Sequence, residues 1–214
     1  EPATAHGLAA SASDDGLRSV PSLWDGLPAG AAFGTVVHGV LEHGLDSPLA
    51  PVARRLWPGG DVPALSAGLA VALDTPLGAL ADDVRLREIS RSDRLAELDF
   101  EMPLAGGDLA GAASVTLDQL VPLWRQHCPA GPLSSYASAL ESLEPAALRG
   151  YLTGSLDAVL RVGSRYLVAD YKTNRLAPAQ EQLTAWHYRP AAMEAEMVRE
   201  HYSLQALLYS VALH

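Results

Sequence analysis

The chain has 214 residues, 49% of them hydrophobic, and a formal net charge of −10 at pH 7, which together indicate a globular domain with one substantial core. Its only cysteine, Cys128, excludes an internal disulfide framework and a four-cysteine iron–sulfur cluster. No apolar run reaches about 18 residues and no leader segment is evident, so we expect a cytoplasmic protein without a membrane-spanning helix.

The first 32 residues differ in composition from the rest of the chain. Residues 1–32 are rich in Ala, Gly, Ser and Pro and show no hydrophobic period, which is typical of a linker. We therefore expect a linker or an extended arm over 1–32, anchored by Trp24, and a single domain over 33–214.

A helix is expected at the start of that domain. Thr35 is suited to be its N-cap, and apolar residues follow at helical spacing: Val37, Val40, Leu41 and Leu45. The same helix carries His38, one turn before Glu42. A single histidine beside an apolar stripe is usually a structural residue, so this helix alone does not assign a function to His38.

Further helices and one strand are expected before residue 150. The helices are predicted near residues 52–57, 64–83, 116–127 and 134–149, with a break at Pro76 and a capping box from Thr116 to Gln119. Residues 94–104 alternate in hydrophobicity, as a half-buried strand does. Glu97 and Asp99 share the polar side of this strand, which is typical of a solvated edge.

Residues 152–162 and 165–173 predict a β-hairpin joined by the two-residue turn Gly163-Ser164. With this turn, Asp157 is opposite Asp170, and their Cβ atoms are expected about 5 Å apart. Strand alternation places Lys172 on the same face as Asp170.

Two carboxylates facing each other in a ladder repel, and aspartate is disfavoured inside strands. A divalent cation would explain the pair, because Mg²⁺ is held by carboxylates together with water and substrate phosphate. A lysine beside such an ion can orient the attacking water or stabilise charge on a phosphate. The alternative is an exposed hairpin face with scattered charges.

The end of the chain predicts a loop region followed by a helix. Residues 175–200 contain Pro178 and Pro190 and are expected to cross the edge of the site before a helix that begins near Tyr202. This helix has an apolar stripe, formed by Leu204, Leu207, Leu208 and Val211. Gln205 and Tyr209 lie one turn apart on a different face, which on its own is typical of a surface.

Four segments of the chain resemble the RecB nuclease family, the nuclease domains of bacterial RecBCD-type helicase–nucleases in the PD-(D/E)XK superfamily. The most specific resemblance joins Gly154-Ser-Leu-Asp157 to Asp170-Tyr-Lys-Thr-Asn174. The other segments are Gly34-Thr-Val-Val-His38, Glu97-Leu-Asp-Phe-Glu-Met-Pro and Gln205-Ala-Leu-Leu-Tyr209. The family's "Pro-Asp" pair is absent, because Leu156 precedes Asp157.

The resemblance implies an α/β fold of the restriction-endonuclease type, with a central mixed sheet of about four or five strands flanked by helices. It implies catalytic roles for Asp157, Asp170 and Lys172. It further implies that one or two metal ions are bound by His38, both aspartates and the backbone carbonyl of Tyr171. Additional site candidates from the same resemblance are Glu97, then Asp99, and also Gln205 and Tyr209, the last two for contact with DNA.

The implied function is hydrolysis of DNA phosphodiester bonds by a Mg²⁺-dependent deoxyribonuclease of the exodeoxyribonuclease V type. Mn²⁺ or Ca²⁺ would be able to replace Mg²⁺ for binding. The sequence has no G-x-x-x-x-G-K-[ST] phosphate loop, so it has no ATP site. The implied partners are DNA, RecC- and RecD-like subunits and the rest of a RecB polypeptide. Two alternatives stay open: an inactive nuclease-like docking scaffold, and a stand-alone exonuclease of the same superfamily.

A net charge of −10 is unusual for a DNA-binding protein. Three arginines near the hairpin are expected to contact phosphates locally: Arg161, Arg165 and Arg175. The chain begins with Glu1 and lacks the C-terminal strand of the family, so we expect a fragment of a larger polypeptide that binds DNA weakly and in a salt-sensitive manner. The abundance of Ala, Leu and Gly suggests a high-GC, actinobacterial source.

Overall fold

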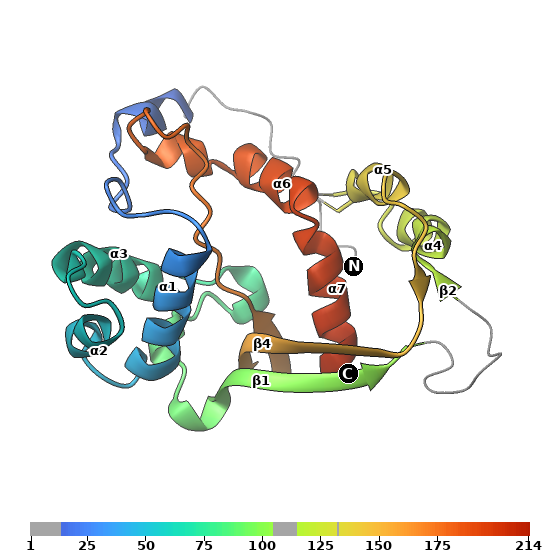
Figure 1. Cartoon of the computed structure of the whole chain (residues 1–214), viewed down its shortest axis with the longest axis horizontal. Coiled ribbons are helices and arrows are strands. Elements are labelled where there is room, and N and C mark those ends of the chain that lie inside the picture. Colours follow the sequence, from blue (N-terminus) through green and yellow to red (C-terminus); the bar gives the residue numbers. More distant parts are fainter. Residues whose placement is uncertain (1–13, 105–114, 132) are drawn as a thin grey trace. The chain divides into compact units, whose positions relative to one another are not determined.

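A computed structural model describes residues 14–104, 115–131 and 133–214 (Figure 1). Residues 1–13 of the expected N-terminal arm lie outside the described residues, and its assignment as a linker stays a prediction. The helices are α1 (Ala31–Gly44), α2 (Leu49–Leu56), α3 (Val62–Asp74), α4 (Leu120–His127), α5 (Tyr136–Glu141), α6 (Pro190–Arg199) and α7 (Tyr202–Leu213). The strands are β1 (Arg94–Pro103), β2 (Val115–Thr116), β3 (Ala147–Leu148), β4 (Tyr151–Val162) and β5 (Arg165–Ala169).

The chain divides into two compact units, and the expected α/β architecture is confirmed. The first unit comprises Leu17–Asp99 and Ser155–His187. The second unit comprises the described residues of Phe100–Gly154 and Tyr188–His214, together with residues 14–16. Strands β1 and β4 contribute residues to both units.

The predicted hairpin forms with the predicted register. Strands β4 and β5 pair antiparallel from Val162↔Arg165 at the turn to Ala158↔Ala169. The prediction that the second strand continues to Thr173 is wrong, because β5 ends at Ala169. Beyond Ala169, the Tyr171 N–H donates to the Asp157 carboxylate at 2.6 Å. This backbone N–H therefore binds a side chain instead of a backbone carbonyl of β4.

The sheet is smaller than expected. Among the described residues it has three strands in the order β1-β4-β5, and β2 and β3 form a separate antiparallel pair. The mixed sheet of four or five strands is therefore not found in the part of the chain that the structure describes. Strand β4 lies at the centre of the sheet, which places Asp157 on its central strand.

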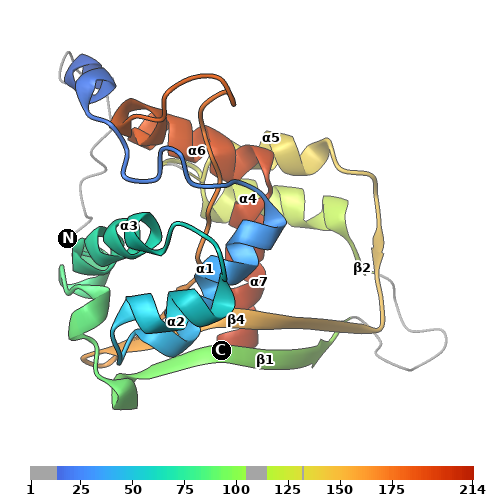
Figure 2. The same ribbon diagram turned by 60° about the vertical axis from the view of Figure 1, so that its left-hand side comes forward.

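The core of the first unit lies between its helices and the hairpin. Helices α1, α2 and α3 lie side by side in this unit (Figures 1 and 2). Their buried apolar side chains pack with residues of β4, and the largest include Val37, Val40, Leu65, Leu69 and Leu160. This packing confirms the apolar stripe predicted for α1, whose burial is the main stabilising contribution.

Two helix boundaries in the first unit differ from prediction. Helix α1 begins at Ala31 with Gly30 as its N-cap, and Thr35 Oγ1 instead donates to the Ala31 carbonyl at 3.1 Å. The N-cap role expected for Thr35 is therefore wrong. Helix α3 ends at Asp74, because Pro76 follows. Leu80, which lies within the predicted helical range 64–83, is outside α3 and 78% exposed.

The second unit has its own smaller core. Val121 and Trp124 of α4 pack against Tyr136 and Leu140 of α5, and Val198 and Leu204 cover them in part. The helix expected over 134–149 is shorter, because β3 pairs with β2 after it. The stripe predicted for α7 is only partly buried, since Val211 is 54% exposed.

Two other expectations in the second unit are corrected. Thr116 precedes the 3₁₀ segment Leu117–Gln119, but its side chain makes no capping hydrogen bond there, so the predicted capping box is wrong. Residues 175–200 contain helix α6, which the prediction treated as loop. Pro190 opens this helix, a position where proline is favoured because its missing N–H is not needed.

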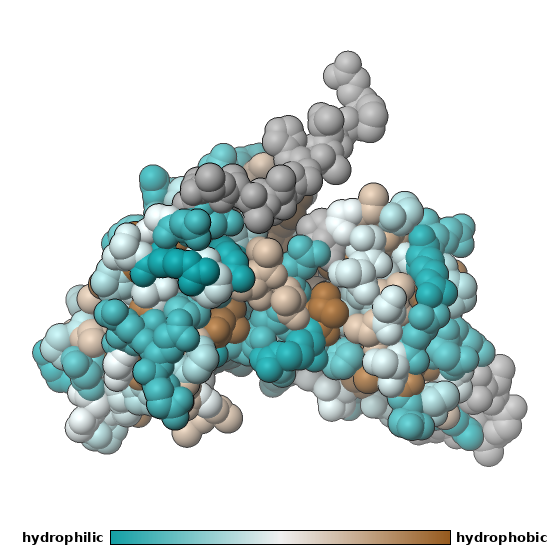
Figure 3. Space-filling model, turned by 90° about the horizontal axis from the view of Figure 1, so that it is seen from above, coloured by the Kyte–Doolittle hydropathy of each residue, from teal (hydrophilic) through white to brown (hydrophobic). Residues whose placement is uncertain are grey.

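Residues 17–32 belong to the first unit. Trp24 meets the Phe33 ring edge-to-face, with ring centroids 6.3 Å apart, so Trp24 anchors this segment as its sequence suggested. None of the helices in the described ranges is both long and apolar enough to cross a lipid bilayer. In the space-filling view, hydrophilic side chains cover much of the displayed surface (Figure 3).

Candidate metal and catalytic site

The site is built on strand β4, where a carboxylate interrupts an apolar sequence. Leu156, Ala158, Val159 and Leu160 are all buried, and the side chain of Asp157 between them is only 10% exposed. A buried carboxylate requires compensating partners. Both oxygens of Asp157 have such partners in the first unit.

The segment after β5 supplies one partner and two further charged groups. Tyr171 N–H donates to Asp157 Oδ2 at 2.6 Å. Lys172 Nζ forms an ion pair with Asp170 Oδ2. Asp170 and Lys172 therefore lie just beyond the strand end, and the direct ladder pairing predicted for Asp157 and Asp170 does not form.

Helix α1 brings His38 to the same place. His38 Nδ1 is 3.3 Å from Asp157 Oδ1, and Nε2 is 2.8 Å from the Tyr171 carbonyl oxygen. The ring of Tyr171 meets the His38 ring edge-to-face, with centroids 6.0 Å apart. The structure thus brings together three of the predicted metal-binding groups: the His38 imidazole, the Asp157 carboxylate and the Tyr171 carbonyl.

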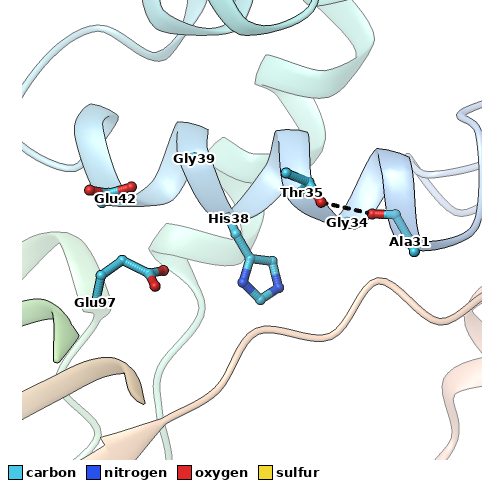
Figure 4. Close-up of a pocket in the computed structure, with 7 residues that line it drawn as sticks. All are labelled: Ala31, Gly34, Thr35, His38, Gly39, Glu42 and Glu97. Carbon is cyan, nitrogen blue, oxygen red and sulfur yellow. Dashed lines mark hydrogen bonds between the residues drawn. The ribbon is translucent and has the colours of Figure 1, made fainter. Parts of the chain in front are cut away.

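Glu97 approaches His38 from strand β1. Its φ of 49° is left-handed, which is uncommon for a non-glycine residue inside a strand. Ligand atoms of Glu97, His38 and Asp157 all lie within 4.8 Å of one another, and Ser155 Oγ donates to Glu97 Oε2 at 3.2 Å. Figure 4 shows the Glu97 carboxylate directed toward the His38 ring.

Asp99, the second acidic candidate on β1, is exposed and is not a member of this group. Sequence reasoning missed Ser155, which orients Glu97, and the aromatic contact of Tyr171. It also missed the left-handed backbone at Glu97. The periodicity of a strand does not indicate a left-handed residue. Ser155 could have been predicted as a neighbour of Asp157, because residues two positions apart in a strand share one face.

The electrostatics of the site favour a charged His38–Asp157 pair. The hydrogen bond to Asp157 is the main cause that raises the pKa of His38, and burial opposes it. Burial works to raise the pKa of Asp157, but hydrogen bonds from His38 and from the Tyr171 amide outweigh it and lower that pKa. The site therefore holds opposite charges in close contact.

The pKa values of Asp170 and Tyr171 respond mainly to burial. Burial raises the pKa of Asp170, although Lys172 acts in the opposite direction. Burial also raises the pKa of the Tyr171 phenol to about 12, and its hydroxyl is buried without a hydrogen-bond partner. The Tyr171 side chain is thus a neutral, packed group.

A pocket of about 500 Å³ opens beside His38. It is lined by residues of α1 and by one residue of β1: Ala31, Gly34, Thr35, His38, Gly39, Glu42 and Glu97 (Figure 4). Small side chains along α1 leave His38 and Glu97 accessible from solvent. The pocket therefore gives a ligand direct access to two of the groups in the cluster.

The donor set fits a divalent metal ion. With His38 in its neutral form, an imidazole nitrogen, carboxylate oxygens and a carbonyl oxygen form a mixed nitrogen and oxygen site, which suits Mn²⁺ and is compatible with Mg²⁺. The partly exposed His38 of α1 and the buried Asp157 of β4 converge at this place. The residues present therefore fit such an ion.

The remaining candidates belong to other elements of the structure. Gln205 and Tyr209 belong to α7 in the second unit, where Gln205 Nε2 donates to the Tyr209 hydroxyl at 2.7 Å. Their contact with DNA stays a prediction. The three arginines expected to contact phosphates each have an acidic partner: Arg161 pairs with Asp93, Arg165 with Asp82 and Arg175 with Asp25.

Comparison with known proteins agrees with the resemblance seen in the sequence. The family described as the PD-(D/E)XK nuclease superfamily matches residues 13–214. The RecBCD enzyme subunit RecB of Mycolicibacterium smegmatis is 46% identical over 211 residues, which cover 91% of this chain and 19% of that protein. RecB of Mycobacterium tuberculosis H37Rv is 46% identical over 88% of this chain and 18% of that protein.

A more distant relative agrees with these two. RecB of Escherichia coli K12 is 34% identical over 87% of this chain and 15% of that protein. The chain therefore spans less than a fifth of the length of these curated relatives.

Proposed function

Because the chain belongs to the PD-(D/E)XK nuclease superfamily, we propose that it is the metal-dependent DNA nuclease domain of a RecBCD-type helicase–nuclease in double-strand break repair and recombination. The observation that carries this proposal is the convergence of the Asp157 carboxylate and the Tyr171 carbonyl on His38, which lines a pocket. The similarity to three RecB subunits supports the choice within the superfamily.

The proposed metal ligands are His38, Asp157, Asp170 and the Tyr171 carbonyl, with Glu97 as an additional ligand. When bound, Mg²⁺ would supply charge stabilisation at the phosphate and make water a stronger nucleophile. Mn²⁺ is the expected substitute, and Ca²⁺ is expected to bind. The contacts of Asp157 with His38 and with the Tyr171 amide hold these groups in place before any ligand arrives.

Lys172 is the proposed catalytic partner. Its ammonium group, held beside Asp170, orients the attacking water and stabilises the negative charge that develops on the phosphate oxygens. The water oxygen forms a bond to phosphorus as its proton passes to solvent, and the bond from phosphorus to the leaving sugar oxygen breaks as that oxygen takes a proton from solvent. Asp170 keeps Lys172 at the reacting phosphate.

The larger assembly is part of the proposal. Binding to RecC- and RecD-like subunits and to the rest of a RecB polypeptide would deliver DNA to this domain, which is consistent with its net charge of −10. Tight DNA binding by the chain alone is not expected. The presence of Asp157, Asp170 and Lys172 together argues against an inactive scaffold.

The test is cleavage of linear DNA with Mg²⁺ by the wild type, Asp157→Asn and Lys172→Ala. We expect cleavage by the wild type that EDTA abolishes, and a loss of at least 100-fold in both variants, an order typical of removing one essential group. Asp83→Asn serves as the control, because Asp83 is an exposed carboxylate in a separate turn. Cleavage retained by Asp157→Asn would contradict the proposal.

A further inference from the structure

The segment that follows the catalytic motif is tied to the N-terminal part of the first unit. We infer that Asp25 is a positioning residue, which fixes the segment carrying Asp170 and Lys172 through Arg175 and the Leu183 amide. This inference rests on the proposed function. It concerns a residue outside the four segments that resemble the nuclease family.

The Asp25 carboxylate connects two points of the chain. Asp25 Oδ1 accepts a hydrogen bond from Leu183 N–H at 2.9 Å and lies 3.5 Å from Arg175 Nη1. Arg175 Nη2 also donates to the Glu181 carbonyl at 2.5 Å. The Arg175 side chain is only 18% exposed, so these partners hold it in a largely enclosed position. We call this set (Asp25, Arg175 and Leu183) the Asp25 link.

Neighbouring contacts make the attachment firm. Two backbone hydrogen bonds of 2.9 Å join the segments, from Ser22 N–H to the Leu183 carbonyl and from Ala185 N–H to the Val20 carbonyl. Nearby, the Arg18 guanidinium lies 3.6 Å from the centroid of the Trp186 ring. The link is therefore part of an ordered attachment rather than an isolated surface ion pair, whose contribution would be small.

The location of the link gives it a role at the site. Beyond Ala169 the chain leaves the sheet. Tyr171 is held there by Asp157 and His38, and Arg175 is held by Asp25. Lys172 lies between these two attachment points, so its position depends on both. A displacement of about 1 Å at a reacting group can reduce a rate by about 100-fold.

The test compares Asp25→Asn and Arg175→Gln with a matched control in the same 214-residue chain. Asp25→Asn keeps an oxygen for the Leu183 amide but removes the charge that faces Arg175. Asp82→Asn is the control, because it breaks an Asp–Arg pair that is more exposed, with Arg165 near the hairpin turn. Measurements are kcat and KM on linear DNA, amide hydrogen exchange over residues 170–176, and the thermal unfolding midpoint.

We expect kcat to fall about tenfold in both variants with KM changed less than about threefold, because positioning affects the transition state more than binding. Exchange over 170–176 should become faster in these variants only. Unfolding midpoints should match that of the control, and Arg175→Lys should recover part of kcat.

Two results would overturn the inference: unchanged kcat despite faster exchange, or a loss of kcat equal to that of Asp82→Asn. A wild type that cleaves no DNA would instead contradict the proposed function. In that case the test of the Asp25 link rests on amide hydrogen exchange alone. Unchanged exchange in Asp25→Asn and Arg175→Gln would overturn the link, and faster exchange confined to 170–176 would support it.

Discussion

Replacing Gly34 by alanine is expected to stabilise the fold and to slow the reaction at the same time. Gly34 lies inside α1, where alanine is favoured over glycine by about 1 kcal/mol. A Cβ atom at this position would lie 3.3 Å from Thr173 Oγ1, slightly closer than ordinary van der Waals contact. The absence of a side chain at Gly34 therefore lets α1 approach the segment that carries the site.

The Gly34→Ala change is expected to lengthen the hydrogen bond between His38 and Tyr171. Nε2 of His38 is 2.8 Å from the Tyr171 carbonyl oxygen, and a shift of a few tenths of an ångström would lengthen it beyond the usual hydrogen-bond distance of about 3.0 Å. We expect kcat on linear DNA to fall about tenfold, which corresponds to about 1.4 kcal/mol of activation free energy. The free energy of unfolding should rise or stay unchanged.

The assay combines urea unfolding with steady-state cleavage of linear DNA at saturating Mg²⁺. The double variant Gly34→Ala/Thr173→Ala removes Oγ1 and should recover most of kcat. Gly44→Ala is the matched control, since it lies in the same helix and its Cβ would be 3.1 Å from Leu49 Cδ2, away from the site. Unchanged kcat in Gly34→Ala, or a loss that Thr173→Ala does not relieve, would refute the reasoning.

Three other changes test separate parts of the account. Lys172→Ala should lower kcat by about 100-fold with little change in metal affinity by calorimetry; an equal loss of both would indicate a structural lysine. Leu160→Ala removes a side chain that is 1% exposed and should cost about 2–5 kcal/mol in urea unfolding; a cost below about 1 kcal/mol would contradict the assigned core. The hydroxyl of Ser90 and the guanidinium of Arg161 lower the pKa of Asp93 in the folded state. This stabilisation is present above the unfolded value of 3.8 and is lost as pH falls through the lower folded pKa. Asp93→Asn should therefore be less stable than wild type near pH 6, and the difference should shrink as the pH falls through the lowered pKa of Asp93; a difference that does not change with pH would argue against the ion pair.

The hairpin register was predictable because a local turn determines it. Gly163-Ser164 permits only a short connection, and the pairing from Val162↔Arg165 onward follows from it. The end of β5 was not predictable from periodicity. A side-chain acceptor on Asp157 competes with the ladder for the Tyr171 amide, and such tertiary competition leaves no trace in local sequence.

For the helices too, some features could be predicted from the sequence and others could not. The apolar stripe of α1 identified the helix, whereas its start depended on Gly30, whose φ of 97° suits glycine rather than residues with a Cβ. Helix α6 was not predicted, although Pro190 occupies its first turn, a position that proline favours. Strands β2 and β3 contribute two residues each, too few for any periodic signal.

For the candidate site, motif resemblance selected residues that the fold then brought together. His38 and Asp157 are far apart in sequence, and only the packing of α1 against the β4–β5 hairpin brings His38 Nδ1 to 3.3 Å from Asp157 Oδ1. The approach of Glu97 depends on a left-handed backbone, and the Asp25 link depends on contacts between distant segments. Neither has a local sequence signature.

The most direct test of the central claim is calorimetric titration of Mn²⁺ into the wild type and Asp170→Ala, followed by cleavage of linear DNA by the same samples. The account predicts saturable binding and metal-dependent cleavage in the wild type, and loss of both in a variant that remains folded. Equal Mn²⁺ binding by the two proteins, or metal-dependent cleavage above a few per cent of wild type in Asp170→Ala, would contradict it.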